Sequence, residues 1–162
     1  MVRGLEPLLG ARRLRVDLKQ TASPLVADVD PLRFQQVIHN LLANAIRFSP
    51  PGSTIDVGTA ATSGPTADQA HVAVPDRGPG IPPAELEQTF DAFGQSGLTQ
   101  DGSGETGLGL GLGLGLGLGL GLAFCRRIMS VLNGRVHAEN RPGGGAAFHV
   151  QVPLRPATVT GP

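Results

Sequence analysis

The feature of the sequence that most constrains its folding is a row of eight Gly-Leu dipeptides over residues 107–122, which continues into the segment AFCRRIMSVL. A helix over this row is unfavourable, because each interior glycine costs about 1 kcal/mol relative to alanine. A strand would place every leucine on one face, a pattern that allows the register to slip. The row is uncharged and approaches the ~20 apolar residues that span a bilayer, so a membrane segment stays an alternative. We favour a phosphate-binding glycine loop enlarged by tandem duplication, since backbone N–H groups at a helix N-terminus bind phosphate.

The remaining composition narrows the class of protein. The chain has 162 residues, which suits one domain with a single core, and its 13 basic and 13 acidic residues leave a net charge of zero. Without a basic field, we expect neither nucleic acid nor direct membrane insertion. Cys125 is the only cysteine, and its apolar neighbours predict a buried thiol in a reducing compartment. The N-terminus has no apolar signal-peptide core, so we expect a cytoplasmic protein.

Helices and strands are predicted on both sides of the row. A helix over residues 31–48 begins at the N-cap Asp30 with Pro31 in its first position, and it ends at Ser49-Pro50. A second helix is predicted over residues 123–132, and a short helical piece over the segment ELEQTFDAF. Strands are predicted over residues 14–18, 24–29, 53–61, 70–74, 135–139 and 146–152.

The predicted helix over residues 31–48 carries two adjacent faces of different character. At 100° per residue, one stripe faces the core and consists of Phe34, Ile38, Leu41, Ala45 and Phe48. Asn40, Asn44 and Arg47 share the neighbouring face. Such a polar row fits either the border of a cleft or an ordinary polar flank.

The segment PDRGPGIPP spaces Asp76, Gly78 and Gly80 two residues apart. A carboxylate there can accept a hydrogen bond from an exocyclic amine, and two glycines let the backbone pass close beneath a flat ligand. The same pattern also fits an ordinary turn. His137 and His149 have no neighbouring metal ligands in the sequence and are expected at surface positions of strands.

Four segments in this order resemble the ATP-binding catalytic domain of sensor histidine kinases, within the larger family of gyrase-type, chaperone-type and mismatch-repair ATPases. NLLANAIRFSP resembles the N box, VPDRGPGIP the first glycine box, TFDAF the phenylalanine box and GLGLGLAFCRRI the second glycine box. The resemblance implies an α/β fold of the Bergerat type, a two-layer sandwich in which helices cover one face of a mixed β-sheet. It covers about residues 13–154, with a lid over 94–118. Residues 1–12 are then an N-terminal remnant or linker, and residues 155–162 a disordered tail.

The resemblance also implies ATP and Mg²⁺ as ligands, and it assigns roles to particular residues. Asn44 matches the Mg²⁺ ligand, Asn40 assists at the metal or the phosphates, and Arg47 contacts phosphate; these three are the implied catalytic residues. Asp76 accepts a hydrogen bond from the adenine amino group, and Gly78 and Gly80 lie under the base. The last copies of the row wrap the phosphates and contribute Gly117, Gly119, Gly121 and Leu122.

The sequence departs from the family pattern in ways that bear on function. Asn40 stands where hydrolysing members carry a glutamate base, and an amide cannot accept a proton from water, which favours phosphoryl transfer over hydrolysis. No Lys or Arg occurs between Arg77 and Arg126, so neutralisation of the phosphates is expected to depend on Mg²⁺ and Arg47. The four histidines, His39, His71, His137 and His149, all fall within the catalytic domain.

Because no phospho-accepting helical segment is recognisable, we expect the ATP-binding catalytic half of a two-component kinase, either a separately encoded subunit of a split kinase or a truncated piece. It would transfer the γ-phosphoryl group in trans to a histidine on a separate dimerisation and phospho-acceptor protein, and a response regulator would receive it indirectly. A sensor partner would recruit the subunit to the membrane. Two alternatives stay open: a nucleotide-binding interaction module without kinase activity, and a serine kinase of the anti-sigma-factor type.

Overall fold

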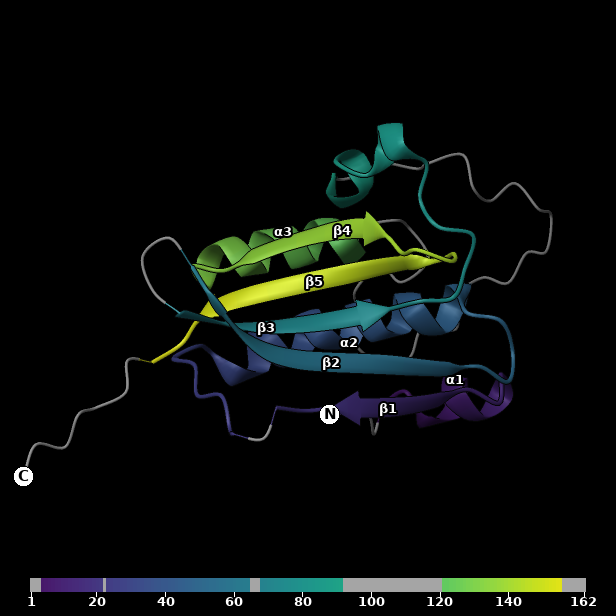
Figure 1. The fold of residues 1–162 in the computed structure, drawn as a ribbon, viewed down its shortest axis with the longest axis horizontal. Helices are drawn as coiled ribbons and strands as arrows, with labels where there is room; N and C mark the ends of the chain where they lie inside the picture. Colours follow the sequence, from purple (N-terminus) through teal and green to yellow (C-terminus); the bar gives the residue numbers. More distant parts are fainter. Residues whose placement is uncertain (1–3, 22, 65–67, 92–120, 156–162) are drawn as a thin grey trace, which may run out of the picture.

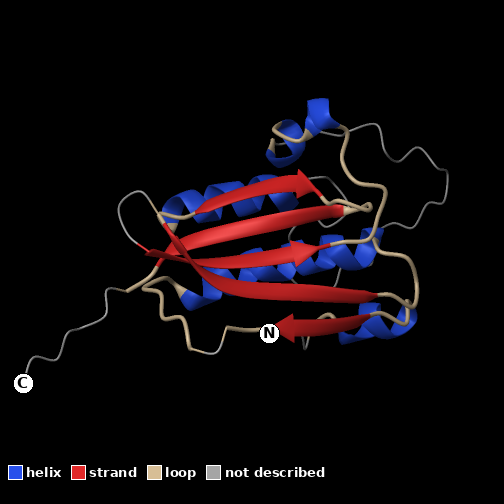
Figure 2. Ribbon diagram, viewed as in Figure 1, coloured by secondary structure: helices blue, strands red, loops and turns tan. Residues whose placement is uncertain are grey.

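A five-stranded mixed β-sheet covered on one face by helices makes up the computed structural model, which describes residues 4–21, 23–64, 68–91 and 121–155 (Figures 1 and 2). The strand order is β1-β2-β3-β5-β4; β1 runs parallel to β2, and the other neighbours are antiparallel. The strands are β1 (Arg15–Lys19), β2 (Thr54–Ser63), β3 (Asp68–Pro75), β4 (Arg135–Asn140) and β5 (Ala146–Pro153). The helices are α1 (Glu6–Ala11), α2 (Pro31–Phe48) and α3 (Gly121–Val131), with 3-10 turns η1 (Pro83–Glu85) and η2 (Gln88–Phe90). This architecture confirms the predicted two-layer α/β sandwich.

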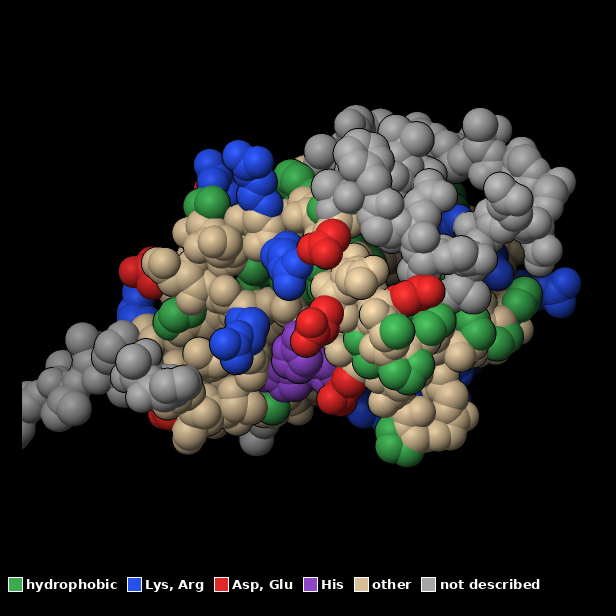
Figure 3. All heavy atoms as spheres, turned by 90° about the horizontal axis from the view of Figure 1, so that it is seen from above, with side chains coloured by type: hydrophobic (Ala, Val, Ile, Leu, Met, Phe, Trp, Pro, Cys, Tyr) green, Lys and Arg blue, Asp and Glu red, His purple; other side chains and the backbone are tan. Residues whose placement is uncertain are grey.

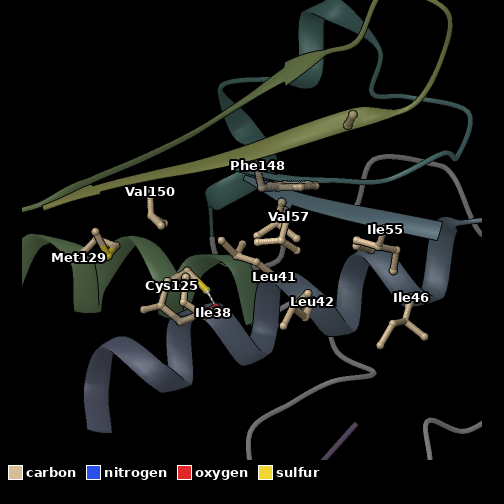
Figure 4. Packing of buried hydrophobic residues seen from close by; sticks show 14 of the residues in the cluster. Ile38, Leu41, Leu42, Ile46, Ile55, Val57, Cys125, Met129, Phe148 and Val150 are labelled. Atoms are coloured by element: carbon tan, nitrogen blue, oxygen red, sulfur yellow. Dashed lines mark hydrogen bonds between the residues drawn. The ribbon is translucent and has the colours of Figure 1, made fainter. Parts of the chain in front are cut away.

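Helix α2 forms the centre of the helical layer and begins as predicted. The Asp30 carboxylate accepts hydrogen bonds from Leu32 N and Arg33 N at 3.0 and 3.1 Å, which satisfies two backbone donors of the first turn. The helix packs on the sheet and on α3, and Figure 4 shows Leu41 of α2 pointing towards the strands. Its buried residues are Val37, Ile38, Asn40, Leu41, Leu42, Ala45 and Ile46.

The predicted core stripe of α2 is correct in part and wrong at its end. Ile38, Leu41 and Ala45 are fully buried, and Phe34 packs against the core. Phe48, however, is 38% exposed, and the Arg47 guanidinium lies 5.4 Å from the centroid of its ring. The buried face is wider than a single stripe because α2 contacts the sheet on one side and α3 on another.

Three other expectations differ from the structure. The strand predicted over residues 24–29 is wrong: Ala27 forms only an isolated bridge with Leu154, and Val26 O accepts one hydrogen bond from Arg155 N, so this segment adds no strand to the sheet. The helical piece after residue 82 consists of the 3-10 turns η1 and η2. Helix α3 begins at Gly121, two residues before the predicted start.

The N-terminal segment is folded onto the core. Leu5, directly before α1, is fully buried, and Leu8 and Leu9 pack against the same cluster. Arg12, after α1, donates hydrogen bonds to the carbonyl oxygens of Ile46 and Arg47 at the end of α2. These contacts tie the segment that the sequence treats as a remnant or linker to α2.

The predicted lid and most of the Gly-Leu row lie outside the described residues, which include only Gly121 and Leu122 of the row. Within the described part of the chain, no helix combines the length and the apolarity needed to cross a membrane.

The outer face of the sheet carries a row of three histidines from adjacent strands: His71 on β3, His149 on β5 and His137 on β4. His71 Nε2 and His149 Nδ1 are 2.9 Å apart, and the His137 and His149 ring centroids are 4.8 Å apart. His149 Nε2 lies 3.2 Å from Glu139 Oε1. The cluster is visible as the purple patch in Figure 3. The expectation of a surface position is therefore wrong for His149, which is only 9% exposed because its neighbours on both strands cover it.

The histidine row predicts that the protein loses stability in acid. Burial lowers the pKa of His71 and of His149 below 6.5, and repulsion from His137 acts in the same direction. The unfolded chain therefore binds more protons than the folded chain as the pH falls through 6.5, so the free energy of unfolding is highest above this pH and decreases below it.

We expect His149→Gln to reduce the loss of stability between pH 7.5 and pH 5.5, as measured by urea unfolding at the two pH values, roughly one pH unit on either side of the histidine pKa. His137→Gln, at an exposed position of the same row, serves as the control and should change this loss less. An acid-induced loss of the same size in His149→Gln and in the parent chain would contradict the assignment.

Candidate nucleotide site

The candidate site is centred on Asp76, the residue that follows β3. Its side chain is 3% exposed, and Oδ1 accepts hydrogen bonds from Gly78 N at 2.8 Å and from Ala146 N at 3.0 Å. Oδ2 accepts no hydrogen bond from the described residues. Two backbone donors therefore hold the carboxylate in one orientation, while its second oxygen stays available to an external donor.

The loop after Asp76 is anchored to the end of α2 and to β2. Arg77 N donates to Oγ of the fully buried Ser49 at 3.1 Å. The Arg77 guanidinium donates to Thr54 O at 3.0 Å and to Asp56 Oδ2 at 3.1 Å, and Asp56 also pairs with Lys19 at 3.4 Å. These contacts connect the loop to the helical layer and to the sheet at once.

The two glycines of the loop are required by backbone geometry. A Cβ atom at position 78 would lie 3.0 Å from Phe48 Cβ and 3.0 Å from Phe48 O, tighter than ordinary Cβ contacts, so glycine favours this approach to the end of α2. Gly80 has φ +84°, a conformation that side chains other than glycine rarely adopt. The expectation that both glycines pass beneath a bound base stays a prediction.

The turn between β4 and β5 closes the other side of the site. Gly145, with φ +85°, lies so close to Asp76 that a Cβ atom there would be 2.3 Å from Asp76 O. Arg141 Nη1 donates to Asp76 O at 2.7 Å. Sequence reasoning did not find these residues, nor Ser49 and Arg77; the run of three glycines in PGGGAAF signals a tight turn but not its partner.

The polar face of α2 divides into three environments. Asn40 is 4% exposed, and its Nδ2 has no hydrogen-bond acceptor among the described residues. Burial raises the pKa of the neighbouring Cys125 thiol to about 12. Asn44, one turn further along, is half-buried, and Arg47 is exposed. The three residues lie on the helix that ends next to the Asp76 loop.

The described part of helix α3 begins with Gly121 and Leu122, the last residues of the Gly-Leu row. Gly117 and Gly119 lie outside the described residues, so the structure does not place them. Residues 88–91 contact both α3 and β5: Arg126 Nη1 of α3 donates to Asp91 Oδ1 at 2.7 Å, and Phe90 packs edge-on against Phe148 of β5 with ring centroids 6.1 Å apart.

Comparisons with known proteins agree with this architecture. The family model described as "Histidine kinase-, DNA gyrase B-, and HSP90-like ATPase" matches residues 29–156. Sensor histidine kinase RcsC of Escherichia coli (strain K12) is 37% identical over 132 residues, which are 81% of this chain and 12% of that protein. Adaptive-response sensory kinase SasA of Synechococcus sp. (strain JA-3-3Ab) is 32% identical over 155 residues, 95% of this chain and 37% of that protein. The chain thus spans a minor part of these relatives.

Solved structures show the same fold. Full-length ShkA in complex with AMPPNP superimposes with a TM-score of 0.73 at 22% identity, covering 94% of this chain and 28% of that one. The mycobacterial sensor histidine kinase MprB gives a TM-score of 0.71 at 27% identity, covering 95% of this chain and 91% of the other. Together, the fold, the ordered motifs and the family match show that the chain belongs to the family of histidine kinase-, DNA gyrase B- and HSP90-like ATPases, and that it is a histidine-kinase-type ATP-binding catalytic domain.

Proposed function

We propose that this chain binds Mg-ATP and transfers the γ-phosphoryl group to a histidine on a separate dimerisation and phospho-acceptor protein, as part of a two-component sensor histidine kinase. The observation that carries the proposal is the buried Asp76 carboxylate, which lies next to the end of the helix that bears Asn44. Two backbone N–H groups occupy its Oδ1 and leave Oδ2 without a donor among the described residues.

Asp76 is suited to recognise adenine. Adenine carries an exocyclic amine where guanine carries a carbonyl oxygen, and a carboxylate oxygen can accept a hydrogen bond from the first but is repelled by the second. Because Asp76 is 3% exposed, an unmatched base would leave a desolvated acceptor unpaired. This asymmetry supports ATP, rather than nucleotides in general, as the ligand.

The residues of α2 fit Mg²⁺ bound mainly through the phosphates. Mg²⁺ prefers oxygen ligands and commonly takes only one or two from the protein, and the described residues contain no group of three acidic, histidine or cysteine side chains that could hold a metal. The half-buried Asn44 would supply the amide oxygen. The unpartnered Nδ2 of Asn40 is a buried donor that a phosphate oxygen could satisfy. Bound Mg²⁺ would neutralise charge on the phosphates, and the exposed Arg47 would add a second positive charge.

The first turn of α3 would complete the phosphate site. The backbone N–H groups of Gly121 and Leu122 lie at the positive end of the helix dipole, where anions bind favourably. Gly117 and Gly119 would continue this cradle along the row. In phosphoryl transfer the protein contributes mainly positioning and charge neutralisation, which these groups can provide.

The chemistry of Asn40 supports transfer of the phosphoryl group to a protein side chain rather than to water. Asn40 cannot serve as a base for water, which favours transfer to a protein group. His39 lies on α2 against Gly4, and the other three histidines lie on the strands in the histidine row. A sensor partner would provide the acceptor helix, recruit the chain to the membrane and pass the phosphoryl group to a response regulator.

Asp76→Asn tests the assignment of the base. The variant keeps an oxygen for Gly78 N and Ala146 N but places an amide donor against the adenine amine, so ATP should bind about 5- to 150-fold more weakly, a loss of about 1–3 kcal/mol. Isothermal titration with ATP and GTP measures this change, and selectivity for ATP should fall. Asp17→Asn, at an exposed carboxylate on β1, is the matched control. Unchanged ATP affinity in folded Asp76→Asn would refute the role of Asp76.

Transfer in trans is tested with γ-labelled ATP. The chain alone should stay unlabelled, whereas addition of a dimerisation and phospho-acceptor domain from a kinase lacking its own ATP-binding domain should give acid-labile label on that partner. Asn44→Ala should abolish this transfer and leave the fold, measured by circular dichroism, intact. Label on this chain alone would contradict transfer in trans, and ATP binding without label on any partner would favour a nucleotide-binding interaction module.

A further inference from the structure

The last residue of β4, Asn140, holds the loop that follows Asp76 at two backbone atoms of one residue. Ile81 N donates to Asn140 Oδ1 at 2.8 Å, and Asn140 Nδ2 donates to Ile81 O at 2.6 Å. The side-chain amide thereby forms hydrogen bonds with both the N–H and the C=O of Ile81, as the backbone of a neighbouring β-strand would. The approach is close, because a Cβ atom on Gly80 would lie 2.9 Å from Asn140 Oδ1.

The same turn between β4 and β5 contacts both ends of residues 76–81. Arg141, next to Asn140, donates to Asp76 O, and Ala146 N donates to Asp76 Oδ1. Asn140 holds the far end of the loop through Ile81. The turn between β4 and β5 therefore contacts the loop at the Asp76 end and at the Ile81 end, on both sides of the Gly78 and Gly80 backbone.

Few interactions within residues 76–81 maintain this geometry. Residues 78–80 are glycine, proline and glycine. Glycine has the most backbone freedom to lose, and proline provides no N–H donor. The hydrogen bond from Gly78 N to Asp76 Oδ1 is the bond that the structure shows within residues 76–81. A loop of this composition would populate several conformations without external contacts, and affinity falls with the fraction of molecules in the binding-competent one.

We infer that Asn140 is a positioning residue of the adenine site: by tying Ile81 to the end of β4, it holds the Gly78 to Gly80 backbone in the conformation that receives the base. The inference rests on the proposed function. Asparagine suits this role because its amide presents a donor and an acceptor side by side, which match one backbone C=O and one N–H. An aspartate of the same shape offers two acceptors, one of which would face Ile81 O.

The test compares Asn140→Asp and Asn140→Ala with Arg135→Ala in the full 162-residue chain. Arg135 is a matched control, because it is an exposed residue at the opposite end of β4 whose side chain forms no hydrogen bond or ion pair with the described residues. Dissociation constants for ATP and for GTP are measured by competition, and the melting temperature of each variant shows whether it is folded.

Both Asn140 variants should bind ATP about three- to tenfold more weakly, as expected for one or two lost hydrogen bonds. Affinity for GTP, which cannot use the Asp76 bond, should change less, so the ratio of the GTP to the ATP dissociation constant should fall. Arg135→Ala should leave both constants unchanged. A purely structural role of Asn140 would weaken both nucleotides equally, and that result, or an unchanged ATP constant, would overturn the inference.

A second variant keeps the inference testable if substitutions at Asn140 prevent folding. Arg141→Gln removes the hydrogen bond to Asp76 O at the other end of the same loop and should also lower the ratio of the GTP to the ATP dissociation constant. An unchanged ratio would contradict positioning of the loop by this turn. Failure of the parent chain to bind ATP would instead refute the proposed function, so the two failures are distinguishable.

Discussion

The burial of α2 between the sheet and α3 is the interaction on which the rest of the structure depends. Ile38, Leu41 and Ala45 are fully buried, and the sheet contributes residues such as Val57 and Val150 to the same cluster (Figure 4). Burial of a large aliphatic side chain contributes about 1.5–3 kcal/mol, so this contact fixes the rotation of α2 about its axis. Because the rotation of α2 is fixed, the helix face that carries Asn40 and Asn44 can point in only one direction, towards the edge of the core.

The end of α2 fixes the position of the loop that follows Asp76. Ser49 is fully buried directly after the helix, and its hydroxyl oxygen accepts the hydrogen bond from Arg77 N. The close approach of Gly78 to Phe48 joins the same two segments. Phe48 therefore serves the contact between helix and loop rather than the core. On the opposite side, the turn between β4 and β5 meets the loop, so Asp76 is held between the two layers of the sandwich.

The two faces of the sheet have separate physical roles. The inner face packs apolar residues on the helices, whereas the outer face gathers the three histidines, Glu139 and the ion pairs of Asp56. The ion pairs are partly exposed and contribute little stability by themselves, but Arg77 belongs to both the outer face and the Asp76 loop. The Arg77 side chain thereby connects the charged residues of the outer face to the Asp76 loop.

The sequence by itself determined what depends on neighbours in the chain. The cap at Asp30, the stop after Phe48 and the spacing of Asp76, Gly78 and Gly80 are local signals, and the resemblance of the four ordered motifs to a known family implied the fold class. Only the tertiary structure decided which distant residues meet. Asn140 and Ile81 are 59 positions apart, and His71 and His149 are 78 apart. Strand order and register produce these contacts, and they result from packing of the whole sheet against the helices, which no local pattern encodes.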